Sequence, residues 1–156
     1  MRKPINLLPV LGMLAGCGGD NGGLAVDVAD VAGSWNAVWQ GMNAPGVSCS
    51  ADGGRLDLTS TGGGRFTGSF RVTTLTCNGS SGGASSGAVV NGNLFEDQIA
   101  FDLNDASFHQ TGRVSGNAMS GQATWTLVIN GTPHSVAGTW NAQRICVTAS
   151  PTAFSC

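Results

Sequence analysis

Few residues of this 156-residue chain carry reactive side chains, and its five cysteines are the most informative of them. Cys17 stands alone near the start, and the other four are Cys49, Cys77, Cys146 and Cys156. Four cysteines predict two disulfides if the chain is exported to an oxidising compartment. No pair has the C-x-x-C spacing of a zinc site, and both histidines lie far from every cysteine, so we expect no metal.

The other titratable and nucleophilic residues form no catalytic pattern. Glu96, the one glutamate, lies near a predicted turn. His109 falls on the outward face of a predicted strand, and His134 falls on the inward face near a strand end. Ser115 lies in a turn but lacks the Gly-x-Ser-x-Gly pattern of a nucleophile elbow. We therefore expect no catalytic residues, no enzyme activity and no cofactor.

The first segment has the layout of a secretory signal. A basic start, Arg2 and Lys3, precedes an apolar run over residues 5–16 that ends in small residues. A bilayer span needs about 20 apolar residues, so this run is too short to be one. The leader therefore predicts export, with cleavage after Gly16.

The residues at the predicted cleavage point are Leu14-Ala15-Gly16-Cys17. This motif resembles the lipobox of bacterial lipoproteins, whose cysteine is acylated and becomes the first residue. The resemblance implies lipidation of Cys17 with fatty acid and a membrane anchor in the cell envelope. In enteric bacteria an Asp after that cysteine retains the lipoprotein in the inner membrane. Here the residue is Gly18, which implies the outer membrane, facing the periplasm or the cell surface.

The chain divides into three parts. Residues 1–16 form the predicted signal peptide, residues 17–31 the lipidated cysteine and a flexible tether with a short helical turn, and residues 32–156 the predicted β-barrel domain. After cleavage the chain has five arginines against nine acidic residues, a net charge of −4. No basic stripe remains, so nucleic acid is not an expected partner.

Alternating apolar and polar residues predict a sheet after residue 32. Short runs are separated by Gly, Asn and Asp, which is typical of strands joined by hairpins. The eight predicted strands cover residues 33–40, 54–61, 65–77, 86–93, 98–103, 106–115, 118–129 and 132–146. The turn between the fourth and fifth strands is either Asn91-Gly92 or Glu96-Asp97, and residues 79–87 are interpreted as a flexible loop.

Two-residue turns at 104–105, 116–117 and 130–131 predict which residues lie side by side. One rung is Phe101, Phe108, Trp125 and Val136. The next rung is Ile99, Gln110, Ala123 and Gly138, and a third holds Gly112, Gly121 and Trp140. All these residues share one face, and the opposite face is polar, as expected for a sheet that covers a core. The polar outer face excludes a membrane-spanning barrel.

The same register reasoning predicts the disulfides. A turn at residues 62–64 pairs Thr61 with Arg65, and the same ladder continued without a bulge places Cys49 opposite Cys77. Opposed residues of antiparallel strands have Cα atoms about 4.5–5.5 Å apart, within disulfide range. The prediction is Cys49–Cys77, which leaves Cys146–Cys156 to hold the tail against the last strand.

Repeated motifs in the first and last strands favour closure of the sheet. Gly33-Ser34-Trp35-Asn36-Ala37 recurs as Gly138-Thr139-Trp140-Asn141-Ala142. The Gly-x-Trp opening and the run over residues 64–70 resemble the avidins and lipocalins. This resemblance implies an all-β, eight-stranded antiparallel up-and-down β-barrel of the calycin type. The positions that match the biotin contacts of avidins are Ala37 and Phe70, which donate no side-chain hydrogen bond, so biotin is not expected.

Two functions of different kinds follow from a small barrel. In the first, the interior binds a small apolar molecule beside the low-volume rung; the candidate ligand-binding residues are Gln110, Ala123, Trp125, Gly138, Trp140 and Trp35. In the second, the core is solid and the chain is a structural or protein-interaction lipoprotein with an envelope protein partner. A barrel of eight strands is just wide enough for either outcome.

Overall fold

The computed structural model describes residues 31–129, 131–145, 147–150 and 153–155. The signal segment, Cys17 and the tether with its expected helical turn lie outside the described residues. Cys146 and Cys156 lie outside them too, so the Cys146–Cys156 disulfide stays a prediction.

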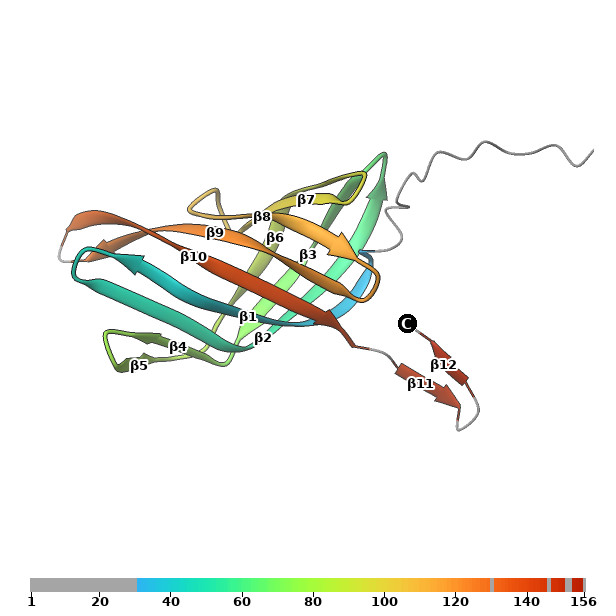
Figure 1. Cartoon of the computed structure of the whole chain (residues 1–156), viewed down its shortest axis with the longest axis horizontal. Coiled ribbons are helices and arrows are strands. Elements are labelled where there is room, and N and C mark those ends of the chain that lie inside the picture. The colour runs from blue at the N-terminus through green and yellow to red at the C-terminus, as the bar shows by residue number, and fades with distance from the viewer. Residues whose placement is uncertain (1–30, 130, 146, 151–152, 156) are drawn as a thin grey trace, which may run out of the picture.

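Eight antiparallel strands close into a barrel, which confirms the predicted fold (Figure 1). They are β1 (Gly33–Ala44), β2 (Val47–Gly62), β3 (Arg65–Val72), β6 (Ser85–Phe95), β7 (Gln98–Leu103), β8 (Phe108–Ser115), β9 (Ala118–Ile129) and β10 (Thr132–Arg144). The ring closes because β1 pairs with both β2 and β10, and Trp39 lies opposite Trp140 at this seam. β11 (Val147–Ser150) and β12 (Ala153–Ser155) form a separate two-stranded sheet.

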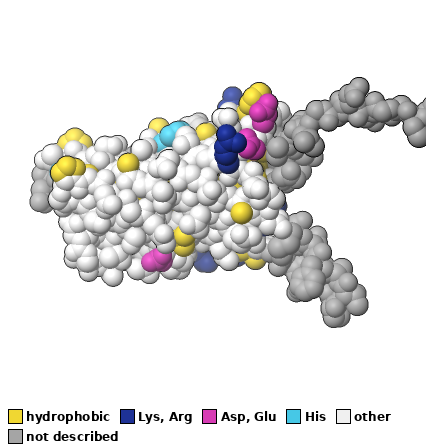
Figure 2. Space-filling model, in the orientation of Figure 1, with side chains coloured by type: hydrophobic (Ala, Val, Ile, Leu, Met, Phe, Trp, Pro, Cys, Tyr) yellow, Lys and Arg dark blue, Asp and Glu magenta, His cyan; other side chains and the backbone are white. Residues whose placement is uncertain are grey.

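Side chains alternate between a buried inner face and a polar outer face. The bulkiest inward side chains are at most 1 % exposed: Trp35, Trp39, Phe66, Phe101 and Trp140. Burying about 150–250 Å² of an aromatic side chain contributes roughly 4–6 kcal/mol before entropy costs, so these rings dominate the core. The side of the barrel that Figure 2 shows carries few charged side chains.

The predicted third strand is in fact two strands. β3 ends at Val72, and β4 (Thr74–Cys77) follows after Thr73. The break matches a bend in β2, where Gly53 has a φ of +61° and the Thr73 hydroxyl donates to the Asp52 carbonyl oxygen. The predicted loop over residues 79–87 contains β5 (Ser80–Gly82), which pairs with β4 as a hairpin beside the barrel.

β2 is twice as long as predicted, and its first half carries the disulfide. It begins at Val47 instead of residue 54, and its residues 49–52 pair with β4. Cys49 lies directly opposite Cys77, with Cα atoms 4.1 Å apart, and the two form a disulfide. The ladder keeps one register from β3 to β4 across the bend, so the predicted Cys49–Cys77 pair is confirmed.

The predicted register between the fifth and sixth strands is wrong by two residues. The turn covers residues 104–107, because Asn104 takes a φ of +64° and the Asp105 side chain accepts a hydrogen bond from the Ser107 amide. Phe101 therefore lies opposite Gln110, and Leu103 lies opposite Phe108. The turn before β7 is at Glu96-Asp97, whereas Asn91 occupies a bulge in β6.

Candidate ligand pocket at the open end of the barrel

One end of the barrel is sealed around Trp35. Its indole is fully buried, and its Nε1 donates to the Val31 carbonyl oxygen at 3.0 Å. The Arg144 guanidinium lies 4.3 Å from the centre of the indole ring and donates to the Ala32 carbonyl oxygen at 2.7 Å. The chain before β1 is thus held across this end, and Trp35 lies in a packed environment.

The centre of the barrel is also filled, contrary to the predicted low-volume rung. The corrected register brings Phe101 beside Gln110 and Ala123, in place of Ile99. Phe101 packs edge-on against Trp140, with ring centres 5.2 Å apart. Ala123 is only 1 % exposed, so neighbouring side chains enclose it, and it is not part of the wall of the pocket described below.

The glycines at the centre of the barrel allow neighbouring backbone and side chains to approach closely, so they leave no void. A Cβ added at Gly138 would lie 2.5 Å from the Gln40 carbonyl oxygen, so its missing side chain lets β1 approach closely. Gly112 and Gly121 face each other in the rung of Trp140, whose Nε1 donates to the Thr111 carbonyl oxygen at 3.1 Å. Glycine at these positions is required by close packing.

A pocket of about 70 Å³ lies at the opposite end of the barrel from Trp35. β8 begins at Phe108, which pairs with Trp125, and β9 continues for four residues beyond that pair. Among the described strands, these last residues of β9 pair only with β10, and β5 on the other side pairs only with β4, while the Thr126 amide donates to the Ser107 carbonyl oxygen of the turn. The unequal strand lengths therefore leave this end open between β4 and β9.

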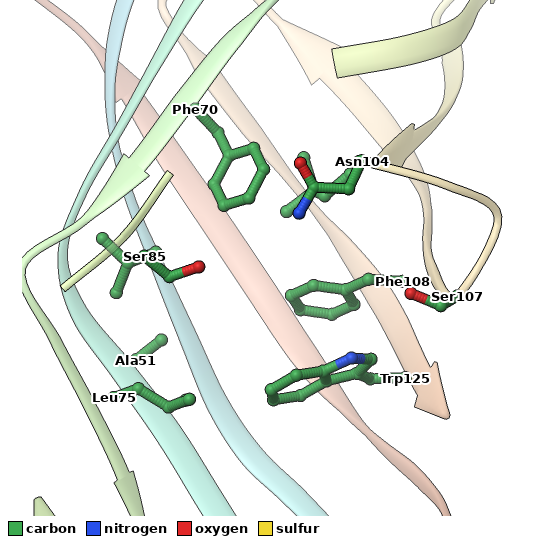
Figure 3. A pocket seen from close by; sticks show the side chains of 10 residues that line it. Ala51, Phe70, Leu75, Ser85, Asn104, Ser107, Phe108 and Trp125 are labelled. Atoms are coloured by element: carbon green, nitrogen blue, oxygen red, sulfur yellow. The ribbon is translucent and has the colours of Figure 1, made fainter. Parts of the chain in front are cut away.

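Aromatic and aliphatic side chains form most of the pocket wall. In Figure 3 the rings of Phe108 and Trp125 lie parallel on one side and Leu75 lies across from them. The two rings are stacked, with centres 5.2 Å apart and an interplanar angle of 23°. The pocket is lined by Ala51, Phe70, Val72, Leu75, Ser85, Leu103, Asn104, Ser107, Phe108 and Trp125.

The polar groups of the pocket are uncharged and lie at its rim. Ser85, Ser107 and Asn104 offer two hydroxyls and an amide, and none of the described residues that line the wall is charged. Ligand pockets for drug-sized molecules measure about 300–1,000 Å³, so this one suits a single ring or a short alkyl chain. The arrangement selects an uncharged apolar group with a hydrogen-bonding end.

A buried donor lies one rung below the pocket. Gln110 is fully buried two residues after Phe108, and its Oε1 accepts a hydrogen bond from Trp39 Nε1 at 2.9 Å. Within the described part of the chain its Nε2 has no hydrogen-bond partner. Leaving a buried donor unsatisfied costs about 1–3 kcal/mol of folding free energy. A ligand whose acceptor reaches this amide would therefore gain about that much binding free energy.

The disulfide supports one wall of the pocket. Ala51 and Leu75 lie opposite each other on β2 and β4, two residues from Cys49 and Cys77 on the same ladder. Both residues line the pocket. The Cys49–Cys77 bond therefore holds the wall that β4 supplies.

Of the six candidate ligand-binding residues, only Trp125 lines the pocket. Gln110 lies below it, Ala123 and Trp140 belong to the packed centre, and Trp35 belongs to the sealed end. Gly138 meets the backbone of β1. Sequence reasoning missed Phe70, Leu75 and the residues of the 104–107 turn, because the short β4 and the longer turn carry no local signal of their own.

The corrected register also reveals a side-chain cluster on the outer wall. Asp102 lies opposite His109, and its Oδ1 is 2.6 Å from the histidine Nδ1. Asn91, in the β6 bulge, donates to the other carboxylate oxygen at 2.8 Å. Asp102 is 6 % exposed, so the pair fixes the orientation of the imidazole. Within the described residues no hydroxyl or thiol is hydrogen-bonded to that ring.

Comparison with protein-family models, curated proteins and solved structures finds no match for this chain. Among the described residues no helix is long and apolar enough to cross a membrane.

Proposed function

We propose that this protein is a lipid-anchored lipoprotein of the cell envelope whose calycin-like barrel binds a small apolar ligand at its open end. The observation that carries the proposal is the uncharged pocket bounded by Phe70, Leu75 and the stacked Phe108–Trp125 pair. This site replaces the central rung as the candidate. Most of the barrel is packed solid, so the open end is where a ligand has room.

The spectroscopic test uses the one tryptophan that lines the pocket. Trp35, Trp39 and Trp140 are at most 1 % exposed, whereas Trp125 is half-buried at the pocket wall. Bromobenzene, a single ring with a heavy atom that quenches indole, should reduce tryptophan fluorescence saturably. Trp125→Phe should abolish the saturable component, and the matched control Trp140→Phe should retain it. Linear quenching alone, equal in both variants, would refute a ligand site at this end.

The anchor is tested separately at Cys17. Supporting it are the basic start, the apolar run and the lipobox-like motif, and Gly18 favours the outer membrane. Two or more acyl chains give stable attachment, where a single chain is marginal. Cys17→Ala should stop cleavage after Gly16 and the incorporation of labelled palmitate. Wild-type palmitate labelling of the variant would exclude lipidation at this residue.

The second candidate function is a structural or protein-interaction lipoprotein. The observation in its favour is the packed interior, together with the exposed edge strand β5 beside the barrel. An unpaired strand edge is a ready surface for another chain. Absence of saturable quenching, with stable lipid anchoring, would favour this second function.

A further inference from the structure

Two arginines face each other on the outer wall of the barrel. Arg55 of β2 and Arg71 of β3 are direct cross-strand partners, and both are exposed while Leu56 and Phe70 beside them are buried. The described residues include five arginines and no lysine, so two of the five positively charged side chains lie directly opposite each other. Like charges directly opposite each other destabilise a strand pair. This arginine pair therefore needs negative charge close by.

The charge of Arg55 is already engaged. Its Nε lies 3.0 Å from both carboxylate oxygens of Asp57, and its Nη2 donates to the Ser34 hydroxyl at 2.9 Å. The Ser34 hydroxyl donates to Asp57, and this hydrogen bond lowers the pKa of Asp57, as do Arg55 and Arg71. Asp57 is therefore ionised at neutral pH and neutralises Arg55.

Arg71 has no such partner. Within the described part of the chain it makes no ion pair, and its neighbour on the other side is Ser86 of β6. An open hollow of about 580 Å³ lies here, and its wall is formed by Arg55, Asp57, Ser69, Phe70, Arg71, Ser86 and Gly87. Two guanidinium groups and one carboxylate give the hollow a net charge of +1, and the serine hydroxyls add hydrogen-bond donors.

We infer that this outer hollow binds the phosphate group of an anionic molecule, with Arg71 as its main contact and Arg55 beside it. The planar fork of a guanidinium matches two phosphate oxygens, and such charge-assisted pairs are about twice as strong as neutral ones. Asp57 supplies one negative charge for two guanidinium groups, so an occupying phosphate balances the remaining positive charge. The two arginines lie on the outer face of the sheet, whereas the apolar pocket opens at the end of the barrel, and Phe70 lines both sites.

The test follows the arginine Nε–Hε signals of the ¹⁵N-labelled full chain by NMR during titration with inorganic phosphate at low salt. The signals of Arg71 and Arg55 should shift saturably, in the millimolar range expected for an exposed site. Arg71→Gln should weaken binding at least about 10-fold (~1.4 kcal/mol). Arg65→Gln is the matched control, because Arg65 lies on the same strand opposite Asn93 and should leave binding unchanged.

A third variant tests the direction of the electrostatic argument. Asp57→Asn removes the carboxylate that competes with phosphate and frees Arg55. Phosphate should therefore bind the Asp57→Asn variant more tightly than the wild-type protein. Weaker binding in Asp57→Asn, or shifts that are equal in Arg71→Gln and Arg65→Gln, would overturn the assignment.

The source of the phosphate is distinguished with two soluble probes. Glycerol 3-phosphate represents a free phosphomonoester, and dihexanoyl phosphatidylglycerol below its micelle concentration represents a lipid headgroup. Saturable shifts of Arg71 with either probe support the site, and the tighter probe identifies the source. Shifts with neither probe would overturn the assignment of the site to the phosphate group of a larger molecule.

Discussion

The sealed end and the open end of the barrel use the same residue type for opposite purposes. At the sealed end Trp35 is fully buried beneath Arg144 and bonded to the backbone of Val31. At the open end Trp125 is half-buried, stacks on Phe108 and faces a small pocket. The difference teaches that strand length, and not side-chain type, decides which tryptophan holds the core and which one is available to a ligand.

The largest expected effect separates the two tryptophans by their contribution to stability. Trp35→Ala should lower the free energy of unfolding by about 3–5 kcal/mol, because it empties a filled site and removes the stacking partner of Arg144. Trp125→Ala should cost less, about 1–3 kcal/mol, since its ring is partly exposed already. Urea unfolding of both variants measures the difference. Equal costs would mean that the two ends are packed alike.

The disulfide should matter for stability and for the open end together. Replacing Cys49 and Cys77 by alanine should cost about 2–4 kcal/mol, because the bond closes a loop with a sequence separation of 28 residues. The double variant should also weaken bromobenzene quenching, since β4 supplies a pocket wall. Quenching that survives the loss of the bond unchanged would show that the wall stands without it.

Two alanines offer a matched comparison between the centre and the pocket. Ala123→Leu should destabilise the fold by about 1–3 kcal/mol, because the centre is already filled. Ala51→Leu should change stability by less than about 1 kcal/mol, since the new side chain enters the pocket, but it should abolish saturable quenching. Thermal unfolding and fluorescence on both variants check this. Tolerance of leucine at Ala123 would restore the central cavity as a candidate.

The smallest expected effect is electrostatic and lies on the outer wall. The Ser34 hydroxyl is the largest cause that lowers the pKa of Asp57, so Ser34→Ala should raise that pKa toward its ordinary value. A lowered folded-state pKa stabilises the fold at neutral pH, and the gain is lost as the pH falls through the folded pKa. Asp57 is half-exposed, so screening keeps the effect small. A carboxyl NMR titration of both proteins measures the shift, and identical titration curves would contradict it.

Much of the barrel follows from local signals in the sequence. The sequences Gly116-Asn117 and Asn130-Gly131 predict the pairing of β9 with its neighbours, and both predicted registers are observed. The predicted Cys49–Cys77 register also holds, although Arg65 pairs with Gly62 and not with Thr61, because a bulge separates that pair from the rest of the ladder. These predictions succeed because a two-residue turn sets the register of its hairpin, and alternation sets the buried face.

The candidate site was not predictable in the same way. The turn at residues 104–107 is longer than predicted and places Phe101 one rung further along. Phe101 thus fills the rung where a cavity was one of two alternatives, and Asp102 lies opposite His109. The pocket itself depends on where β8 begins and on the side on which β4 lies. Local sequence determined the buried face of the barrel strands, two of the hairpin registers and the Cys49–Cys77 pair, because alternation and short turns act between near neighbours along the chain. Only the tertiary structure decided where space remains, because a cavity depends on how side chains from distant strands fill a common volume.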